Sequence, residues 1–346
     1  MSKVAIISAK NSGKSTIFKI LTGNDNLEGT VKVSDNRLTR LSEIFKPKKT
    51  TYATFNIIDI PSKENSNFNL NAQELQSAEL LLLVLRLFED PTIYYPFGPE
   101  IDPVNEYDNL ISELRFKDLE LLDKRAERIK SSLKSAKKTE REEKEKELTL
   151  IENIKQGLEN GVDISNQNLS DKEISELSSY NLITLKKRII ILNINDNTSQ
   201  DKLSSIKEHL SDKESLLTFD GKLELELAEL DDNDKDEWKK EMGIEYFSSE
   251  LIVLESFKHL KYITFFTMGE DECRAWPIIK GTNAKRAAGK IHSDLERGFI
   301  RAEVIHFDDF VKSGSVNEAK KSGLYRLEGA DYIVKDGDIL NIRFNV

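Results

Sequence analysis

Short and nearly continuous apolar runs constrain the fold of this chain more than any other feature of its sequence. Val4–Ile7, Thr54–Ile58 and Leu80–Leu85 are separated by stretches of helical periodicity, and two further runs follow at Ile189–Leu192 and at residues 216–217. Strands that are apolar throughout are buried on both faces, as in parallel sheets covered by helices. The sequence therefore predicts an α/β domain with a mostly parallel sheet.

The interval between the third and fourth of these runs is too long for one crossover and predicts an inserted helical hairpin. Its first helix carries apolar residues at alternating spacings of three and four, and its second helix ends at Asn160–Gly161. This spacing is the a/d seam of a coiled coil. The tip is expected near residues 134–139, and the seam closes either within the hairpin or on another chain. The seam positions are Leu119, Leu122, Ala126, Ile129 and Leu133 on the first helix and Leu148, Ile151, Ile154 and Leu158 on the second.

The chain is acidic overall, but the hairpin is locally basic. With 51 Lys and Arg against 61 Asp and Glu, the formal charge is −10, which argues against a generic nucleic-acid binder. From Lys124 to Lys146, however, ten basic residues face five acidic ones. Two interpretations stay open: a solvated coiled-coil face, or an arm that contacts RNA phosphate or an acidic partner.

Several classes of protein are excluded by composition. No apolar run approaches the roughly 20 residues that a membrane helix needs, and the first residues lack the pattern of a signal peptide. The single cysteine, Cys273, excludes a disulfide framework, and no Cys/His spacing indicates zinc. We therefore expect a soluble, cytoplasmic protein without a membrane partner.

The segment Ser8–Thr16 lies between the first apolar run and a helix, where phosphate-binding loops occur. Such a loop needs successive backbone N–H groups at a helix N-terminus, a lysine for the β/γ-phosphates and a hydroxyl for Mg²⁺. Gly13, Lys14 and Ser15 supply these parts, although Ser8 replaces the first glycine of the usual motif. The alternative is an ordinary strand-to-helix turn with a solvated lysine. The predicted phosphate-binding residues are Asn11, Ser12, Gly13, Lys14, Ser15 and Thr16.

A second element of this site is an acidic residue at the end of the next apolar strand. Asp59 follows Ile57 and Ile58 directly, and with Ser15 it is the predicted Mg²⁺ ligand. Pro61–Ser62 stands where a switch glycine is usual, and no glycine occurs between Thr30 and Phe97. Loops that order on a triphosphate use a permissive backbone, so the sequence supports nucleotide binding more than hydrolysis.

A third element follows the fourth apolar run. Asn193-Ile194-Asn195-Asp196 stands where a GTPase carries Asn-Lys-x-Asp, but the lysine that flanks guanine is Ile194. We expect Asn193 to tie the phosphate loop to the base-binding loop and Asp196 to accept from a base. The alternative is a polar strand end that caps the next helix.

The last eighty-odd residues differ in pattern from the rest and predict a small α+β module. Tyr262–Met268, Cys273–Ile279 and Ile339–Val346 are expected to form strands, and Lys335–Asp338 has the composition of a hairpin turn. The final strand alternates apolar and polar residues, as a half-buried antiparallel strand does.

The order of these elements resembles the Obg-like ATPase family, YchF, over essentially the whole chain. The resemblance is closest in the carboxy-terminal module, where many short blocks occur in the family's order. These blocks are Arg274–Trp276, Lys280–Thr282, Ala287–His292, Glu296–Ala302, Arg326–Gly329, Asp331–Val334 and Phe344–Val346.

The resemblance implies three domains and a function. It implies a P-loop G domain at residues 1–103 and 185–262, an inserted helical hairpin at 104–184 and a TGS-like β-grasp domain at 263–346. It further implies ATP in preference to GTP, Mg²⁺, association with the ribosome and a modest, partner-dependent ATPase. The chain departs from the family pattern at Ser8, at Ser62 and at Asp196, where the family has glutamate. The alternative function is a hydrolysis-deficient pseudo-NTPase that serves as a ribosome- or RNA-binding scaffold.

The carboxy-terminal module also contains a basic cluster that predicts contact with ribosomal RNA. Six basic residues face two acidic ones between positions 280 and 301, with Trp276 and Phe299 nearby. The alternative is a scatter of charges around the β-grasp sheet. The candidates are Lys280, Lys285, Arg286, Lys290, Arg297 and Arg301.

Overall fold

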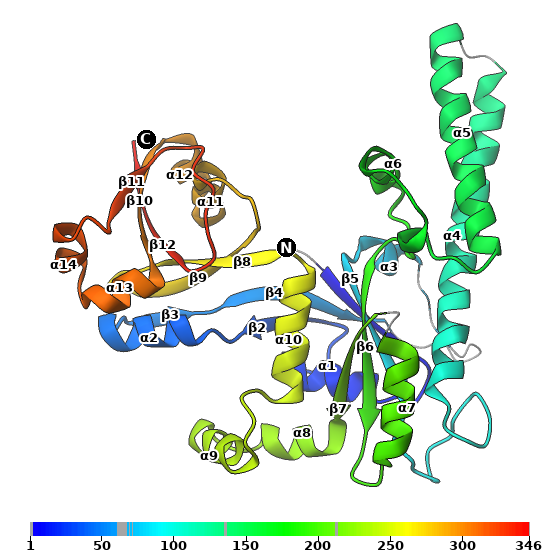
Figure 1. Ribbon diagram of the computed structural model, residues 1–346, viewed down its shortest axis with the longest axis horizontal. Helices are drawn as coiled ribbons and strands as arrows, with labels where there is room; N and C mark the ends of the chain where they lie inside the picture. The colour runs from blue at the N-terminus through cyan, green and yellow to red at the C-terminus, as the bar shows by residue number, and fades with distance from the viewer. Residues whose placement is uncertain are drawn as a thin grey trace. The chain divides into compact units, whose positions relative to one another are not determined.

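The computed structural model describes residues 3–60, 68, 70, 72–134, 137–211 and 214–345 and divides into two compact units (Figure 1). The first unit comprises Met1–Gly29 and Asn56–Ser249, and the second comprises Thr30–Phe55 and Glu250–Val346. Residues 30–55 thus group with the carboxy-terminal residues, although the boundaries implied by the resemblance assign them to the G domain. In the described part of the chain, no helix has the length and apolarity needed to cross a membrane.

The first sheet contains all five apolar runs that predict the strands of the α/β domain. Its order is β2-β4-β1-β5-β6-β7, and β4, β1, β5, β6 and β7 pair in parallel. All seven residues of β5 are buried, as a strand covered on both faces requires. The strands are β1 (Lys3–Ser8), β2 (Glu28–Val33), β4 (Ala53–Asp59), β5 (Leu80–Arg86), β6 (Lys187–Ile194) and β7 (Ser215–Asp220).

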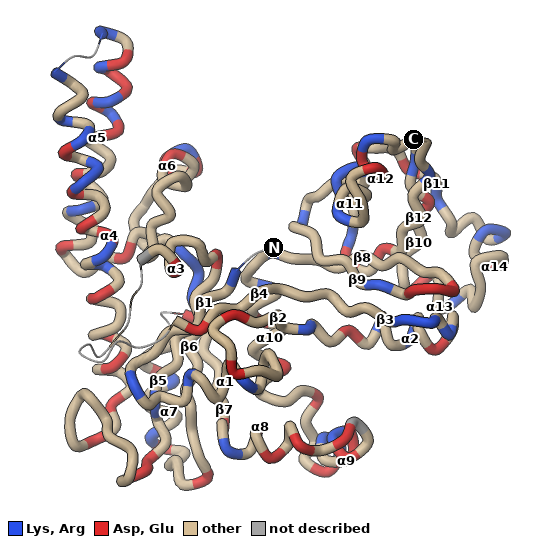
Figure 2. Tube along the Cα trace, turned by 180° about the vertical axis from the view of Figure 1, so that it is seen from behind, with Lys and Arg blue, Asp and Glu red and all other residues tan. Residues whose placement is uncertain are grey.

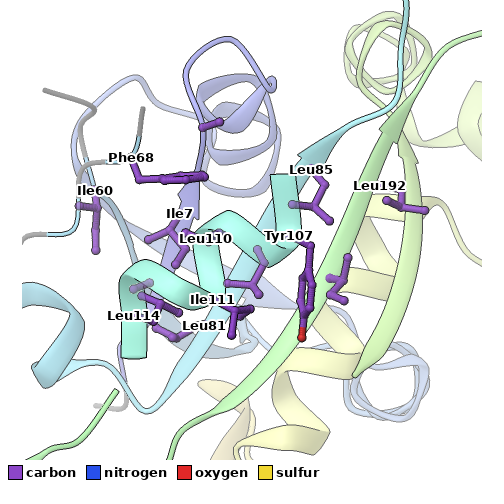
Figure 3. Close-up of a cluster of buried hydrophobic side chains, with 14 of the residues drawn as sticks. Ile7, Ile60, Phe68, Leu81, Leu85, Tyr107, Leu110, Ile111, Leu114 and Leu192 are labelled. Carbon is purple, nitrogen blue, oxygen red and sulfur yellow. The ribbon is translucent and has the colours of Figure 1, made fainter. Parts of the chain in front are cut away.

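Helices cover this sheet and bring the candidate site to its carboxyl edge. One cluster of buried side chains joins the sheet to α3 (Ala72–Ser77), α4 (Pro103–Leu133) and α7 (Gln200–Ser211). Figure 3 shows Leu110 and Ile111 of α4 beside Ile7 and Leu81 of the sheet. Elsewhere in the unit, α1 (Lys14–Thr22) and α8 (Gly221–Ala228) contact each other, and α9 (Asp232–Met242) follows in the chain. The next helix, α10 (Ser248–His259), begins at the end of this unit and belongs mostly to the second.

The predicted helical hairpin is present, and its seam closes within the chain. Beyond the sheet, α4 continues beside α5 (Lys138–Glu159), and the two helices are seen together in Figure 1. Asn160 and Gly161 end α5 as predicted, and α6 (Asp171–Leu177) follows, flanked by the 3₁₀ turns Ile164–Asn166 and Ser178–Tyr180. The buried seam residues are Leu122, Ala126, Ile129, Ile151, Ile154 and Leu158, with Leu119, Leu133 and Leu148 partly buried against them.

The second unit is built on a mixed sheet of order β11-β10-β12-β8-β9-β3. The pairs β8–β9, β10–β12 and β10–β11 are antiparallel, whereas β12–β8 and β3–β9 are parallel. These strands are β3 (Lys49–Thr51), β8 (Tyr262–Thr267), β9 (Glu272–Ile279), β10 (Phe299–His306), β11 (Arg326–Glu328) and β12 (Asp338–Phe344). The helices are α2 (Asn36–Phe45), α11 (Ala284–Ile291), α12 (Ser293–Arg297), α13 (Phe307–Ser313) and α14 (Val316–Lys321).

Two details of this unit differ from the sequence prediction. The turn at Lys335–Asp338 does not close a hairpin, because β12 pairs with β10 and β8 and not with the preceding strand β11. The strand β3 was not predicted, because Lys49-Thr50-Thr51 is short and polar and forms only by pairing with β9. The three strands that were predicted in this unit are confirmed as β8, β9 and β12.

Candidate functional site

The loop between β1 and α1 presents free backbone donors at a helix N-terminus. Asn11 and Gly13 adopt left-handed conformations, with φ of 63° and 87°. Gly13 is the N-cap residue of α1 and provides no side-chain hydrogen bond to the first turn. The N–H groups of that turn are therefore available to an anion, which the helix dipole also favours.

Lys14, Ser15 and Asp59 come together beside this loop, as the sequence predicts. Lys14 Nζ forms a buried ion pair with Asp59 Oδ1 and also donates to the carbonyl oxygen of Ile60. Ser15 Oγ donates to Asp59 Oδ2 at 3.3 Å. Burial lowers the pKa of Lys14, while the hydrogen bond and the charge of Asp59 act in the opposite direction. A cation and an anion, Lys14 and Asp59, are thus held together at the start of α1. The predicted switch position, Pro61–Ser62, lies outside the described residues.

The same residues fit a magnesium ion. Mg²⁺ prefers hard oxygen ligands and usually reaches protein through one or two side chains, phosphate oxygens and water. The hydroxyl of Ser15 and the carboxylate of Asp59 are such ligands, and they lie within hydrogen-bond distance of each other.

Asn193 ties the phosphate loop to the neighbouring strand ends. Its Nδ2 donates to the carbonyl oxygen of Ser12 at 2.9 Å, and its Oδ1 accepts from the N–H of Gly221 at 3.3 Å. A Cβ on Gly13 would lie 2.1 Å from Asn193 Nδ2, so the amide fills the space that the glycine leaves open. The tie expected from the sequence is therefore present, and it extends to the start of α8. Asp196 lies in the turn after β6 with an exposed side chain.

Glu106 is a contributor to this site that sequence reasoning missed. It lies in the first turn of α4, is completely buried, and accepts from Ser12 Oγ at 2.8 Å. Burial raises its pKa to about 7, against the hydrogen bonds that favour its charged form. A glutamate in a first helical turn is common, so only the fold could reveal its contact with the loop.

Arg86, at the end of β5, is a second residue that was missed. Its side chain is almost fully buried and donates to the carbonyl oxygens of Phe88, Asp90 and Ile93. The guanidinium also lies over the Phe88 ring, 4.4 Å from its centroid. Arg86 therefore orders the segment after β5, whose Tyr94 carbonyl accepts from Asn11 Nδ2 at 3.0 Å.

The six residues predicted to contact RNA share an exposed position but differ in their ion pairing. All six are exposed, and Lys285, Arg286 and Lys290 lie on the outer side of α11 because Ala284, Ala287 and Ala288 are buried. Figure 2 shows Lys and Arg along this helix. Arg297 pairs with Asp294, whereas in the part of the chain described here the other five make no ion pair: Lys280, Lys285, Arg286, Lys290 and Arg301.

Of the two aromatic residues expected beside the basic cluster, Trp276 is buried and Phe299 is only partly buried. Trp276 is buried in the core of the second unit, stacks on Phe265 and donates to Thr267 Oγ1 at 3.0 Å. Its ring is not open to a base, because it is buried, stacks on Phe265 and lies under the Arg274 guanidinium, whose Cζ is 3.9 Å from the ring centroid. Phe299 also packs against this core, although it is only partly buried.

On the hairpin, four of the ten basic residues between positions 124 and 146 form ion pairs with acidic residues of the hairpin itself. Arg125 pairs with Glu147 and Lys130 with Glu152 across the two helices. Arg141 pairs with Glu145 and Lys144 with Glu140 along α5. These pairs favour the interpretation of a solvated coiled-coil face.

Comparison with known proteins places these features in a family. The family model described as "50S ribosome-binding GTPase" matches residues 3–153. The model for the YchF GTPase carboxy-terminal domain, described as "Protein of unknown function", matches residues 262–345.

Whole-length relatives give the same result. The chain is 34% identical over 367 residues to the "Ribosome-binding ATPase YchF" of Haemophilus influenzae, covering 99% of each chain. It is 33% identical over 373 residues to the protein of that name from Mycoplasma genitalium, covering 100% of each. The solved structure of the YchF GTPase of Schizosaccharomyces pombe matches 99% of this chain and 97% of its own, with a TM-score of 0.89 and 27% identity. This chain belongs to the YchF family.

Proposed function

We propose that this protein binds ATP with Mg²⁺ at the phosphate loop, hydrolyses it slowly, and uses it to govern association with the ribosome in the cytoplasm. The observation that carries the proposal is the convergence of Lys14, Ser15 and Asp59 on the uncapped N-terminus of α1. The names of the relatives, which are ribosome-binding ATPases, support the choice of nucleotide and partner.

Each residue of the site has a role in this proposal. The amides from Asn11 to Thr16 would cradle the phosphates, and Lys14 would exchange its contact with Asp59 for the β/γ-phosphates. Ser15 would hold Mg²⁺ directly and Asp59 through water, and the bound ion would neutralise phosphate charge. Asn193 would keep the loop aligned with the base-binding segment, where Asp196 would accept from the base.

The test of the phosphate site is calorimetric titration of nucleotide-stripped protein with ATP and with GTP in the presence of Mg²⁺. Lys14→Ala should weaken ATP binding at least 100-fold, because it removes the side-chain charge that would contact the β/γ-phosphates. Lys19→Ala, on the exposed side of the same helix, is the matched control and should bind as the wild type does. Unchanged affinity in Lys14→Ala would contradict the proposal, and equal binding of GTP would remove the preference for ATP.

The alternative function is a scaffold that binds the ribosome but has lost hydrolysis. The absence of glycine between Thr30 and Phe97 favours it, since both switch regions fall in this interval. Co-sedimentation with ribosomes, with and without ATP, separates the two functions. Binding that ignores ATP, together with no release of phosphate above the rate of Lys14→Ala, would favour the scaffold.

We further propose that α11 supplies the RNA-binding face of the second unit. Reversing Lys285, Arg286 and Lys290 to glutamate should weaken ribosome binding and make it less sensitive to salt, because three phosphate contacts are lost. Reversal of Lys312, Lys320 and Lys321, which are exposed in the same unit, changes the net charge equally and is the control. Equal effects of the two reversals would mean that only net charge matters.

A further inference from the structure

The carboxylate of Glu106 is surrounded by hydrogen-bond donors from three segments of the first unit. Ser12 Oγ donates to Oε1 at 2.8 Å, while the N–H of Arg86 at 3.2 Å and Tyr95 Oη at 3.3 Å donate to Oε2. The N–H of Ala9 also bonds to this carboxyl group. Two of the four donors, Ala9 and Ser12, belong to the phosphate loop.

In the described ranges no cation forms an ion pair with this buried carboxylate, and the charge of the nearby Arg86 guanidinium acts on it without direct contact. The guanidinium of Arg86 turns toward the backbone carbonyls of Phe88, Asp90 and Ile93, and only the backbone N–H of Arg86 reaches Glu106. A buried carboxylate without an ion pair lowers the stability of the fold, so a contribution to stability alone does not account for a glutamate at this position. Its position is accounted for if the conformation of the phosphate loop depends on the hydrogen bonds that Ser12 and Ala9 donate to it.

Further contacts join the loop to the segment between β5 and α4. Tyr95, which donates to Glu106, packs edge-on against Phe97 with ring centroids 5.5 Å apart. Phe97 in turn packs against Phe68, and Phe68 pairs with Ala9 of the loop in an isolated antiparallel bridge. The phosphate loop, the segment after β5 and the first turn of α4 therefore form one connected structure.

We propose that Glu106 is a positioning residue for nucleotide binding, which holds Ser12 and the phosphate loop in their binding shape against the first turn of the helical hairpin. This inference rests on the proposed function, because it concerns the same phosphate site. Glu106 does not touch the nucleotide in this proposal; it acts through Ser12 and Ala9. The hydroxyl of Ser12 is the one tie that can be removed without disturbing the other donors.

The charge of Glu106 should make nucleotide affinity depend on pH. The groups that face it are Ser12 from the loop, Arg86 from β5 through its N–H and its charge, and Tyr95 from the segment before α4. The single hydroxyl proton of Tyr95 is shared between Glu106 and the carbonyl oxygen of Asp102, which is nearer at 2.9 Å. A negative carboxylate beneath the loop repels phosphate, and its pKa of about 7 lies in the accessible range. Affinity should therefore be higher at pH 6, where Glu106 is largely neutral, than at pH 8.

The test uses two variants of the full chain and two matched controls. Ser12→Ala removes the tie, and Glu106→Gln keeps it without charge, because the Ser12 hydroxyl can turn to accept from the amide. Ser256→Ala removes another buried serine hydroxyl, and Asp118→Asn neutralises the other buried carboxylate of α4. The readouts are calorimetric affinity for Mg²⁺ and ATP at pH 6 and pH 8, and hydrogen exchange of residues 8–16 without nucleotide.

Ser12→Ala should lower ATP affinity about tenfold and speed hydrogen exchange of the loop, since one bond to a charged group no longer orders it. The ratio of wild-type to Glu106→Gln affinity should fall about fivefold from pH 6 to pH 8, and titration of ATP itself cancels in this ratio. Both controls should match the wild type in affinity.

Two negative results have different meanings. If the wild type binds ATP but Ser12→Ala matches Ser256→Ala in affinity and exchange, Glu106 does not position the loop and the proposed function stands. If the wild type binds neither ATP nor GTP, the proposed function fails and this inference fails with it. Should Glu106→Gln not fold, Ser12→Ala decides the question alone.

Discussion

Replacement of Gly13 by alanine tests the packing of the phosphate loop against Asn193. Two separate costs are expected. The backbone has φ of 87°, which costs an alanine about 1 kcal/mol relative to glycine. The new Cβ would also lie 2.1 Å from Asn193 Nδ2, and this amide is buried and bonded to both Ser12 and Gly221. To move away it must give up two hydrogen bonds worth about 1 kcal/mol each.

Gly13→Ala should therefore destabilise the first unit by about 3 kcal/mol. Gly23→Ala is the matched control at the other end of α1, because Gly23 has φ of 70° but nothing within 4 Å of a Cβ. It should cost only about 1 kcal/mol. Native-state hydrogen exchange of β1 and β6 measures both opening free energies in the unit concerned.

A double variant isolates the clash from the strain. Asn193→Ala alone loses both hydrogen bonds, about 2 kcal/mol, and in its background Gly13→Ala should add only the strain of about 1 kcal/mol. The two single changes would then sum to about 5 kcal/mol against about 3 for the pair, a coupling of about 2 kcal/mol. If Gly13→Ala and Gly23→Ala cost the same, or if Gly13→Ala and Asn193→Ala are strictly additive, the new Cβ does not displace the Asn193 amide.

Three further predictions concern the rest of the first unit. Burial raises the folded-state pKa of Glu106 from 4.5 to about 7, so between these pH values the folded protein keeps a proton that the unfolded chain has lost. The free energy of unfolding therefore falls as pH rises through this window. Between pH 4.5 and pH 8, urea unfolding should show that the wild type loses up to about 3 kcal/mol more stability than Glu106→Gln does. Arg188→Ala should cost about 3 kcal/mol in the same assay, because it leaves the carboxylate of Glu214 without its cation, while Asp163 keeps its ion pair with Arg115. Ile151→Ala should lower the free energy of opening of α4 and α5 by about 2–5 kcal/mol, seen as faster hydrogen exchange, while exchange in β1 stays slow. An equal fall in β1 would show that the hairpin seam is not a separate cooperative region.

Local pattern was enough to predict the elements whose residues carry their own signal. The all-apolar run at Leu80–Leu85 predicted a strand buried on both faces, and it forms β5 together with Arg86. The spacing of Leu122, Ala126 and Ile129 predicted a helical seam that the structure places against α5. Gly13, Lys14 and Ser15 predicted the loop, because its chemistry depends on consecutive residues.

Residues whose role depends on a distant partner could not be predicted in this way. Lys49–Thr51 has no apolar pattern and becomes a strand only beside Glu272–Arg274, more than two hundred positions away. Trp276 was expected near an RNA surface, but its place opposite α11 makes it part of the core. In both cases the deciding contact lies in another part of the chain.

The parallel sheet, the helical hairpin and the phosphate loop could be predicted from local sequence, because each follows from periodicity or spacing over a short stretch of chain. Two other features follow from long-range contacts alone: residues 30–55 group with the carboxy-terminal unit, where β3 joins its sheet, and Glu106 lies beneath the phosphate loop. The physical reason is that burial and hydrogen-bond partners, which turn a common glutamate into an unpaired carboxylate with a raised pKa, come from segments that meet only when the chain folds.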